Sequence, residues 1–154
     1  LDQALETLSE HRAREGAQIR EMLQTRCEAV SQQVAHVRAR RPQVLEALRT
    51  RLQTRIQELG TDLDPGRLEQ ELALQAQKLD VAEELDRLDA HVAEVRAILE
   101  RDEPVGRRLD FLMQEMNREA NTLSSKSNDM DTTQAAVELK VLIEQMREQV
   151  QNVE

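Results

Sequence analysis

The spacing of the apolar residues is the feature that most constrains what this chain can fold into. In the stretch 106–126 they recur at steps of three and four, at Leu109, Leu112, Met113, Met116, Ala120 and Leu123. This spacing places them on one face of a helix. Heptad-like series also run from Leu23 to Val37 and from Val81 to Leu99. Because a helix with one apolar stripe must bury it against another element, the chain has to assemble from packed helices.

The near absence of aromatic residues points the same way. Phe111 is the one aromatic residue among 154, whereas charged residues make up 33% of the chain and Gly and Pro number 4 and 3. Aliphatic side chains must therefore supply the burial, as they do in helical bundles and coiled coils. We predict an all-α fold of about five helices, two of them long, with a hairpin or coiled-coil-like arm and a C-terminal helical bundle.

Local signals indicate where the helices begin and end. Pro42 is expected to kink or restart a first long helix at Arg41, and the following helix reaches about Leu59. Breaks in the periodicity follow at 60–66, 102–104 and 124–130. Asp64 and Pro65 are typical of a helix start, and that helix should continue to about Arg101. Asp131 should cap the last helix.

These breaks predict an Arg-rich arm over residues 1–59, a linker over 60–66 and a C-terminal helical domain over 67–154. The chain opens with Leu1 rather than Met, so we expect the natural protein to extend further toward its N-terminus. The chain has no apolar run of the roughly 18–20 residues that span a bilayer, and no signal peptide is recognisable.

Charge is distributed unevenly along the chain. The net charge is −9, yet residues 11–55 hold ten Arg against four Glu, a local charge of +6. Such a segment could attract a polyanion such as RNA, or it could be an ordinary solvated helix. Cys27 is the lone cysteine and falls in an apolar series, which indicates a core residue. A single cysteine cannot form a disulfide within the chain, which suits a reducing compartment.

Two polar lines lie beside the apolar stripes. One consists of Asp110, Gln114, Asn117 and Asn121. Because Asn and Asp are poor helix formers, this line predicts either a buried structural network or a site for a polar ligand. The other consists of Asp80, Glu84, Arg87 and His91. Its carboxylates and imidazole could hold Mn²⁺ or Mg²⁺, or Arg87 could pair them in a salt-bridge ladder.

A pair of glutamates follows on the next helix. Glu115 and Glu119 lie four residues apart, so they could share a metal or act as acid and base, or they could be an exposed pair that mildly repels. Cationic side chains that could contact phosphate lie nearby, at Arg107, Arg108, Arg118 and Lys126. The chain contains no phosphate-binding glycine loop, no nucleophile elbow and no zinc motif.

Three long segments resemble the YicC/YloC family of bacterial endoribonucleases, known as stress-induced proteins. They read RLEQELALQAQKLDVAEELDRLDAHV (67–92), VGRRLDFLMQEMNREANTLSSKSND (105–129) and AVELKVLIEQMREQVQNVE (136–154). The resemblance implies a cytoplasmic enzyme that cuts RNA with a divalent cation, often Mn²⁺, and that forms a ring-like homo-oligomer such as a hexamer. It also implies an N-terminal domain that is missing here, on which the activity of this piece would depend.

Chemistry within the matching segments gives a hypothesis for the site. Asp80, Glu84, His91, Glu115 and Glu119 are the candidate metal ligands. Among them Glu115, Glu119 and His91 are the candidates for activating a water or a 2′-hydroxyl. The RNA-binding candidates are Arg87, Arg107, Arg108, Arg118 and Lys126. A second reading remains open, in which the chain is a non-catalytic RNA-binding or oligomerisation module that regulates RNA decay.

Overall fold

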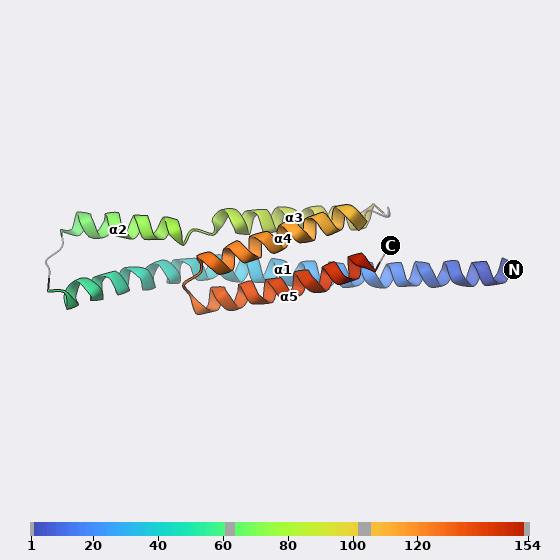
Figure 1. The fold of residues 1–154 in the computed structure, drawn as a ribbon, viewed down its shortest axis with the longest axis horizontal. Coiled ribbons are helices and arrows are strands. Elements are labelled where there is room, and N and C mark those ends of the chain that lie inside the picture. The colour runs from blue at the N-terminus through green and yellow to red at the C-terminus, as the bar shows by residue number, and fades with distance from the viewer. Residues whose placement is uncertain (1, 61–63, 102–105, 153–154) are drawn as a thin grey trace.

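The computed structural model of the chain describes residues 2–60, 64–101 and 106–152, and over these residues it is built of five helices (Figure 1). They are α1 (Asp2–Glu58), α2 (Pro65–Lys78), α3 (Ala82–Glu100), α4 (Gly106–Lys126) and α5 (Met130–Gln151). The predicted all-α class is confirmed. No helix among the described residues is both long enough and apolar enough to cross a membrane.

Four of the helices form a bundle around one core. α1 contacts α3 and α5, and α4 contacts the same two helices, so the contacts close a cycle. α1 runs the length of the molecule, with α3, α4 and α5 alongside its middle and α2 beside its C-terminal part (Figure 1). The N-terminal part of α1 extends beyond the bundle, where Leu5 and Leu8 are exposed.

The predicted apolar stripes line this core. The six apolar residues of the 106–126 stripe are all buried in α4. The buried residues of α1 include the predicted series Leu23, Cys27, Val30, Val34 and Val37. A helix–helix core of this kind relies on branched aliphatic and Met side chains, which explains how the chain folds with a single Phe, itself exposed at position 111.

The predicted break at Pro42 is wrong, because α1 continues through Pro42 to Glu58. An internal proline removes one backbone hydrogen bond and crowds the preceding turn. Tertiary contacts on both sides outweigh that cost. Val37 and Leu48 are buried, and Arg41 pairs with Asp80 of the α2–α3 connection.

The expected single helix from Asp64 to Arg101 is also wrong, because it is divided into α2 and α3 at residues 79–81. Asp80 lies in the connection, where its Oδ1 accepts a hydrogen bond from the backbone N–H of Ala82 at 2.9 Å. The same side chain faces Arg41 at 2.9 Å. These two contacts stabilise an interruption that the apolar periodicity does not reveal. The predicted helix start at Asp64 is confirmed, since its carboxylate accepts from the N–H of Gly66.

The turn between α4 and α5 is shorter than predicted. α4 continues to Lys126, so only residues 127–129 lie outside the two helices. Asp129, and not Asp131, caps α5 by accepting a hydrogen bond from the backbone N–H of Thr132 at 3.1 Å. Arg40 of α1 lies within 3.1 Å of the same carboxylate and holds the pKa of Asp129 below its usual range. The predicted break at 102–104 lies outside the described residues.

Burial should keep the Cys27 thiol unreactive while the protein is folded. Cys27 is fully buried in the core, and this burial raises its pKa to about 11 against a smaller opposing effect of Arg96. Because the thiolate is the nucleophile, we expect no measurable reaction with a disulfide reagent at pH 8 and full reaction once urea unfolds the chain. Absorbance of the thiol released from the reagent measures the reaction rates of the folded and the unfolded protein. Fast reaction of the folded protein would contradict this burial.

Candidate metal centre and its ion pairs

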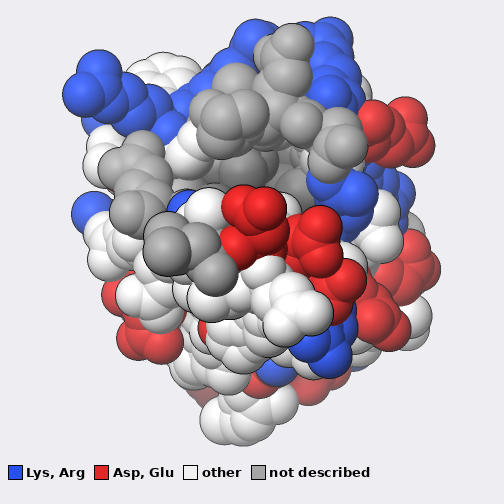
Figure 2. Space-filling model, turned by 90° about the vertical axis from the view of Figure 1, so that its right-hand side faces the viewer, with Lys and Arg blue, Asp and Glu red and all other residues white. Residues whose placement is uncertain are grey.

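Four of the six arginines in the C-terminal half of α1 form ion pairs with acidic residues of other helices or of the connections between them. Arg38 pairs with Asp86 and Asp89 of α3, and Arg49 pairs with Glu69 of α2. Arg40 and Arg41 pair with the helix connections, as described above. Seen from the end at which α1 begins, acidic and basic side chains both reach the surface and neither sign covers it (Figure 2). Four arginines of the predicted basic segment are therefore paired with acidic residues within the protein.

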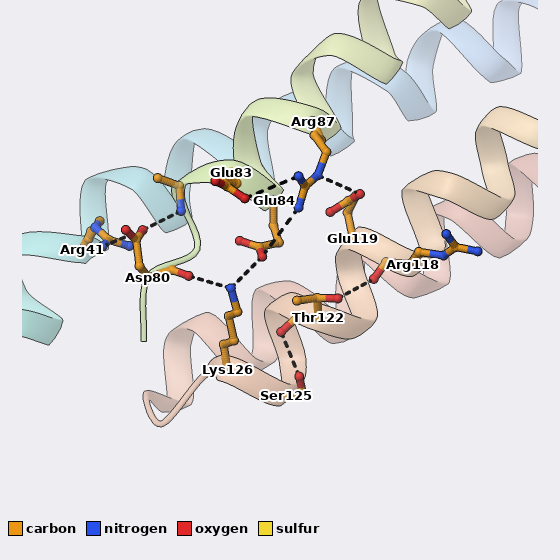
Figure 3. A network of polar contacts seen from close by, with 11 residues as sticks. Arg41, Asp80, Glu83, Glu84, Arg87, Arg118, Glu119, Thr122, Ser125 and Lys126 are labelled. Atoms are coloured by element: carbon orange, nitrogen blue, oxygen red, sulfur yellow. Dashed lines mark hydrogen bonds and ion pairs between the residues drawn. The ribbon is translucent and has the colours of Figure 1, made fainter. Parts of the chain in front are cut away.

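A second set of ion pairs joins α3 to α4. Arg87 of α3 donates from Nε to Glu119 Oε1 of α4 at 3.0 Å (Figure 3). Its Nη atoms lie 3.5 Å from Glu83 and 3.8 Å from Glu84. The Glu119 hydrogen bond is the main reason that the pKa of the Arg87 guanidinium is raised. Arg87 thus forms ion pairs with three carboxylates. Of the two carboxylates in the salt-bridge ladder considered from the sequence, Glu84 is paired with Arg87 and Asp80 is paired with Arg41 instead.

Glu84 is the most deeply buried charged residue of this network. Only 2% of it is exposed, and its Oε1 accepts a hydrogen bond from Lys126 Nζ at 2.8 Å. The ammonium group also donates to the backbone carbonyl of Asp80 at 3.1 Å, as Figure 3 shows. Oε2 of Glu84 is buried without a hydrogen-bond partner. Lys126 therefore pairs with a buried carboxylate and links the end of α4 to the start of α3 through hydrogen bonds.

Three predicted ligands meet one to two turns further along α3. His91 of α3 and Glu115 and Glu119 of α4 each offer one ligand atom, and these atoms all lie within 4.8 Å of one another. His91 and Glu115 are partly buried, whereas Glu119 is only 6% exposed. The four-residue spacing of the glutamates places both on the side of α4 that faces α3. One imidazole and two carboxylates form a donor set that fits a divalent cation such as Mn²⁺.

The other predicted metal ligands are not part of this group. Asp80 faces Arg41 in the α2–α3 connection, and Glu84 is held by Lys126. Asp80 is displaced because the helix that was expected to align it with Glu84 and His91 is interrupted. The structure thus assembles three of the five predicted ligands and gives the other two structural partners.

The predicted RNA-binding residues fall into two groups. Arg87 and Lys126 face inward to carboxylates, and Arg108 pairs with Glu94 of α3 at 2.7 Å. Arg107 is exposed, and the Arg118 side chain is 75% exposed, lying 3.7 Å from Glu115 at the edge of the three-ligand group. Of these five cations, Arg118 is therefore the most exposed one that lies beside the group, whereas the half-exposed Arg87 is hydrogen-bonded to Glu119.

The polar line along α4 lies at the surface and not between packed helices. Gln114 and Asn121 are exposed, and Asp110 and Asn117 are partly buried, which rules out the predicted buried network. Gln114 donates to Asp110 at 3.0 Å, and Arg147 of α5 approaches the same carboxylate at 3.3 Å. The start of the line therefore contacts α5 through Arg147.

Comparison of the sequence with known proteins identifies a family to which the chain is similar. The C-terminal part of the YicC-like endoribonucleases, described as "Endoribonuclease YicC-like, C-terminal", matches residues 37–154. The "Probable endoribonuclease YicC" of Haemophilus influenzae is 53% identical over 143 residues, which are 93% of this chain and 50% of that protein. The protein of the same name from Clostridioides difficile is 38% identical over 157 residues, covering 100% of this chain and 54% of that protein. The chain spans about half the length of the curated relatives it matches.

Proposed function

Because the chain belongs to the YicC-like endoribonuclease family, whose C-terminal region it matches, we propose that it is the C-terminal part of a metal-assisted enzyme that cleaves RNA phosphodiester bonds. The observation that carries the proposal is the convergence of His91, Glu115 and Glu119 at the α3–α4 contact. The two relatives are named probable endoribonucleases, which supports RNA as the substrate.

The residues of this group suit a divalent cation. Glu115 and Glu119 would supply two negative charges and His91 a neutral nitrogen, a set that Mn²⁺ accepts and that Mg²⁺ accepts less readily. A bound divalent cation acidifies a water molecule and polarises a phosphoryl oxygen. Arg87 donates a hydrogen bond to Glu119 Oε1, so this buried carboxylate has a cationic partner before any ligand arrives. Arg118 is exposed beside Glu115, where it can pair with an RNA phosphate.

The test is cleavage of a labelled structured RNA by this chain in EDTA, Mg²⁺ or Mn²⁺. We expect cleavage with Mn²⁺, none with EDTA, and a loss of at least about a hundredfold in rate in the Glu115→Gln/Glu119→Gln variant, because both charged ligands are gone. Glu138→Gln removes one exposed carboxylate of α5 and serves as the control, with an unchanged rate. Cleavage that survives the double substitution would contradict the assignment.

The Haemophilus influenzae relative, which is about twice as long, belongs in the same assay. Cleavage by both proteins indicates a site complete in these 154 residues. Cleavage by the relative alone indicates a composite site that needs the rest of the longer chain. RNA binding by both without cleavage favours the second reading, a non-catalytic RNA-binding or oligomerisation module.

The family resemblance also leads us to propose a cytoplasmic location and assembly as a homo-oligomer. Sedimentation velocity of the chain and of the longer relative tests the assembly. A monomer in both cases would contradict it.

A further inference from the structure

Arg87 occupies the position of a resident counter-cation beside the candidate metal ligands. Its Nε binds Oε1 of Glu119, the most buried member of the three-ligand group, at 3.0 Å. Glu119 is therefore shared between a guanidinium on one side and the group formed with His91 and Glu115 on the other. Both partners would be attracted by the one negative charge of Glu119, so a guanidinium and a metal cation at this carboxylate would each weaken the binding of the other.

The charges around Glu119 show why a counter-cation is needed. Glu119 and Glu84 are both almost fully buried, and Glu115 lies partly buried next to Glu119. Lys126 neutralises Glu84 but does not reach Glu119. Without Arg87, Glu119 would be a buried carboxylate beside a second carboxylate, an arrangement that is costly in the interior. Arg87 therefore stabilises the protein in the absence of a metal.

A divalent cation at the group would perform the same electrostatic task. It would place two positive charges on Glu119 while a guanidinium already contacts the same carboxylate, and like charges so close together repel. The side chain of Arg87 is 49% exposed, and the exposed Glu83 lies 3.5 Å from it. When a metal ion binds Glu119, the guanidinium can therefore move into solvent or toward Glu83.

We propose that Arg87 and the divalent cation compete for Glu119, so that Arg87 sets the metal concentration at which the site fills. This inference rests on the proposed metal site. It distinguishes Arg87 from a residue that only positions Glu119, because loss of a competitor tightens metal binding, whereas loss of a positioning residue weakens it.

Isothermal titration of the chain with Mn²⁺ tests the competition directly, without any measurement of cleavage. Arg87→Met removes the charge and keeps an unbranched apolar side chain of similar reach. We expect it to bind Mn²⁺ about tenfold more tightly than the unchanged protein, in the usual range of coupling between two ligands. Arg87→Lys keeps the charge but loses the fixed Nε contact, so its affinity should lie between the two.

Arg118→Met is the matched control. It also removes an arginine beside the group, but Arg118 is far more exposed and lies 3.7 Å from Glu115. Solvent screens such a charge, so the affinity should change by no more than about twofold. An equal gain in both variants would mean that any nearby positive charge has this effect and would overturn a specific role for Arg87.

The remaining outcomes separate this inference from the metal site on which it rests. Mn²⁺ binding that disappears in Glu119→Gln, but is unchanged or weaker in Arg87→Met, keeps the metal site and overturns the competition. No binding by the unchanged protein or by any variant overturns both. Circular dichroism and urea unfolding verify that each variant is folded. If Arg87→Met fails to fold, the Mn²⁺ affinity of Arg87→Lys decides the question. An affinity of Arg87→Lys for Mn²⁺ no higher than that of the unchanged protein would then overturn the proposal.

Discussion

Replacing Lys126 with Met should destabilise the protein by about 2–3 kcal/mol, because a buried carboxylate loses its cationic partner. The cost is below that of breaking a fully buried ion pair, since the Lys126 side chain is itself 36% exposed. The reason is Glu84, which is 2% exposed and whose carboxylate lies 2.8 Å from the Lys126 ammonium group. Its other oxygen has no hydrogen-bond partner. The nearest remaining cation is Arg87 at 3.8 Å, which is already hydrogen-bonded to Glu119. Urea unfolding followed by circular dichroism measures the change.

The double variant Glu84→Met/Lys126→Met shows whether the unpaired carboxylate of Glu84 causes the loss of stability in Lys126→Met. Removing both partners replaces an ion pair with two apolar side chains of similar size, so its stability should lie within about 1 kcal/mol of the unchanged protein. Lys140→Met, a partly exposed lysine of α5, is the control and should change stability by about 0.5 kcal/mol or less. If Lys126→Met costs no more than the control, the pair contributes little and Arg87 compensates for it.

The apolar faces of the helices could be predicted because they depend on local spacing alone. A regular helix turns by a fixed angle per residue, so the residues from Leu109 to Leu123 share a face whatever they pack against. The same rule placed Glu115 and Glu119 together on α4. Grouping them with His91 required only that α3 and α4 be neighbours, which their short connection favours. Three ligands of the candidate site could therefore be predicted from the sequence.

What could not be predicted depends on contacts between residues far apart in the chain. Asp80 fits the polar line of α3 by spacing, but its pairing with Arg41 and its bond to Ala82 place it in a connection. Nothing in the spacing of Lys126 indicates that it reaches Glu84, because that depends on how α4 packs against α3. The spacing of the polar line from Asp110 to Asn121 left a buried network and a ligand site both open, because the surroundings of Asp110 depend on Arg147 of α5.

Pro42 is the clearest case in which tertiary packing overrides a local signal, and it leads to the second prediction. Replacing Pro42 with Ala should stabilise the protein by about 2 kcal/mol. Pro42 is exposed inside α1, so its ring gains nothing from burial. A proline in a helix interior costs about 3 kcal/mol, because the carbonyl of Arg38 loses its hydrogen-bond partner and the ring crowds it. Greater freedom of the unfolded Ala variant returns about 0.4–1 kcal/mol of that gain.

Thermal unfolding tests this prediction, and the midpoint should rise by about 4–8 °C in a chain of this size. Gln53→Ala, at an exposed position of the same helix, is the control and should change stability by no more than about 0.5 kcal/mol. A neutral or destabilising effect of Pro42→Ala would contradict the argument. It would mean that Val37 and Leu48, buried on either side of Pro42, need the helix geometry that proline imposes in order to pack together. The sign of the change therefore decides whether Pro42 is tolerated by this fold or required by it.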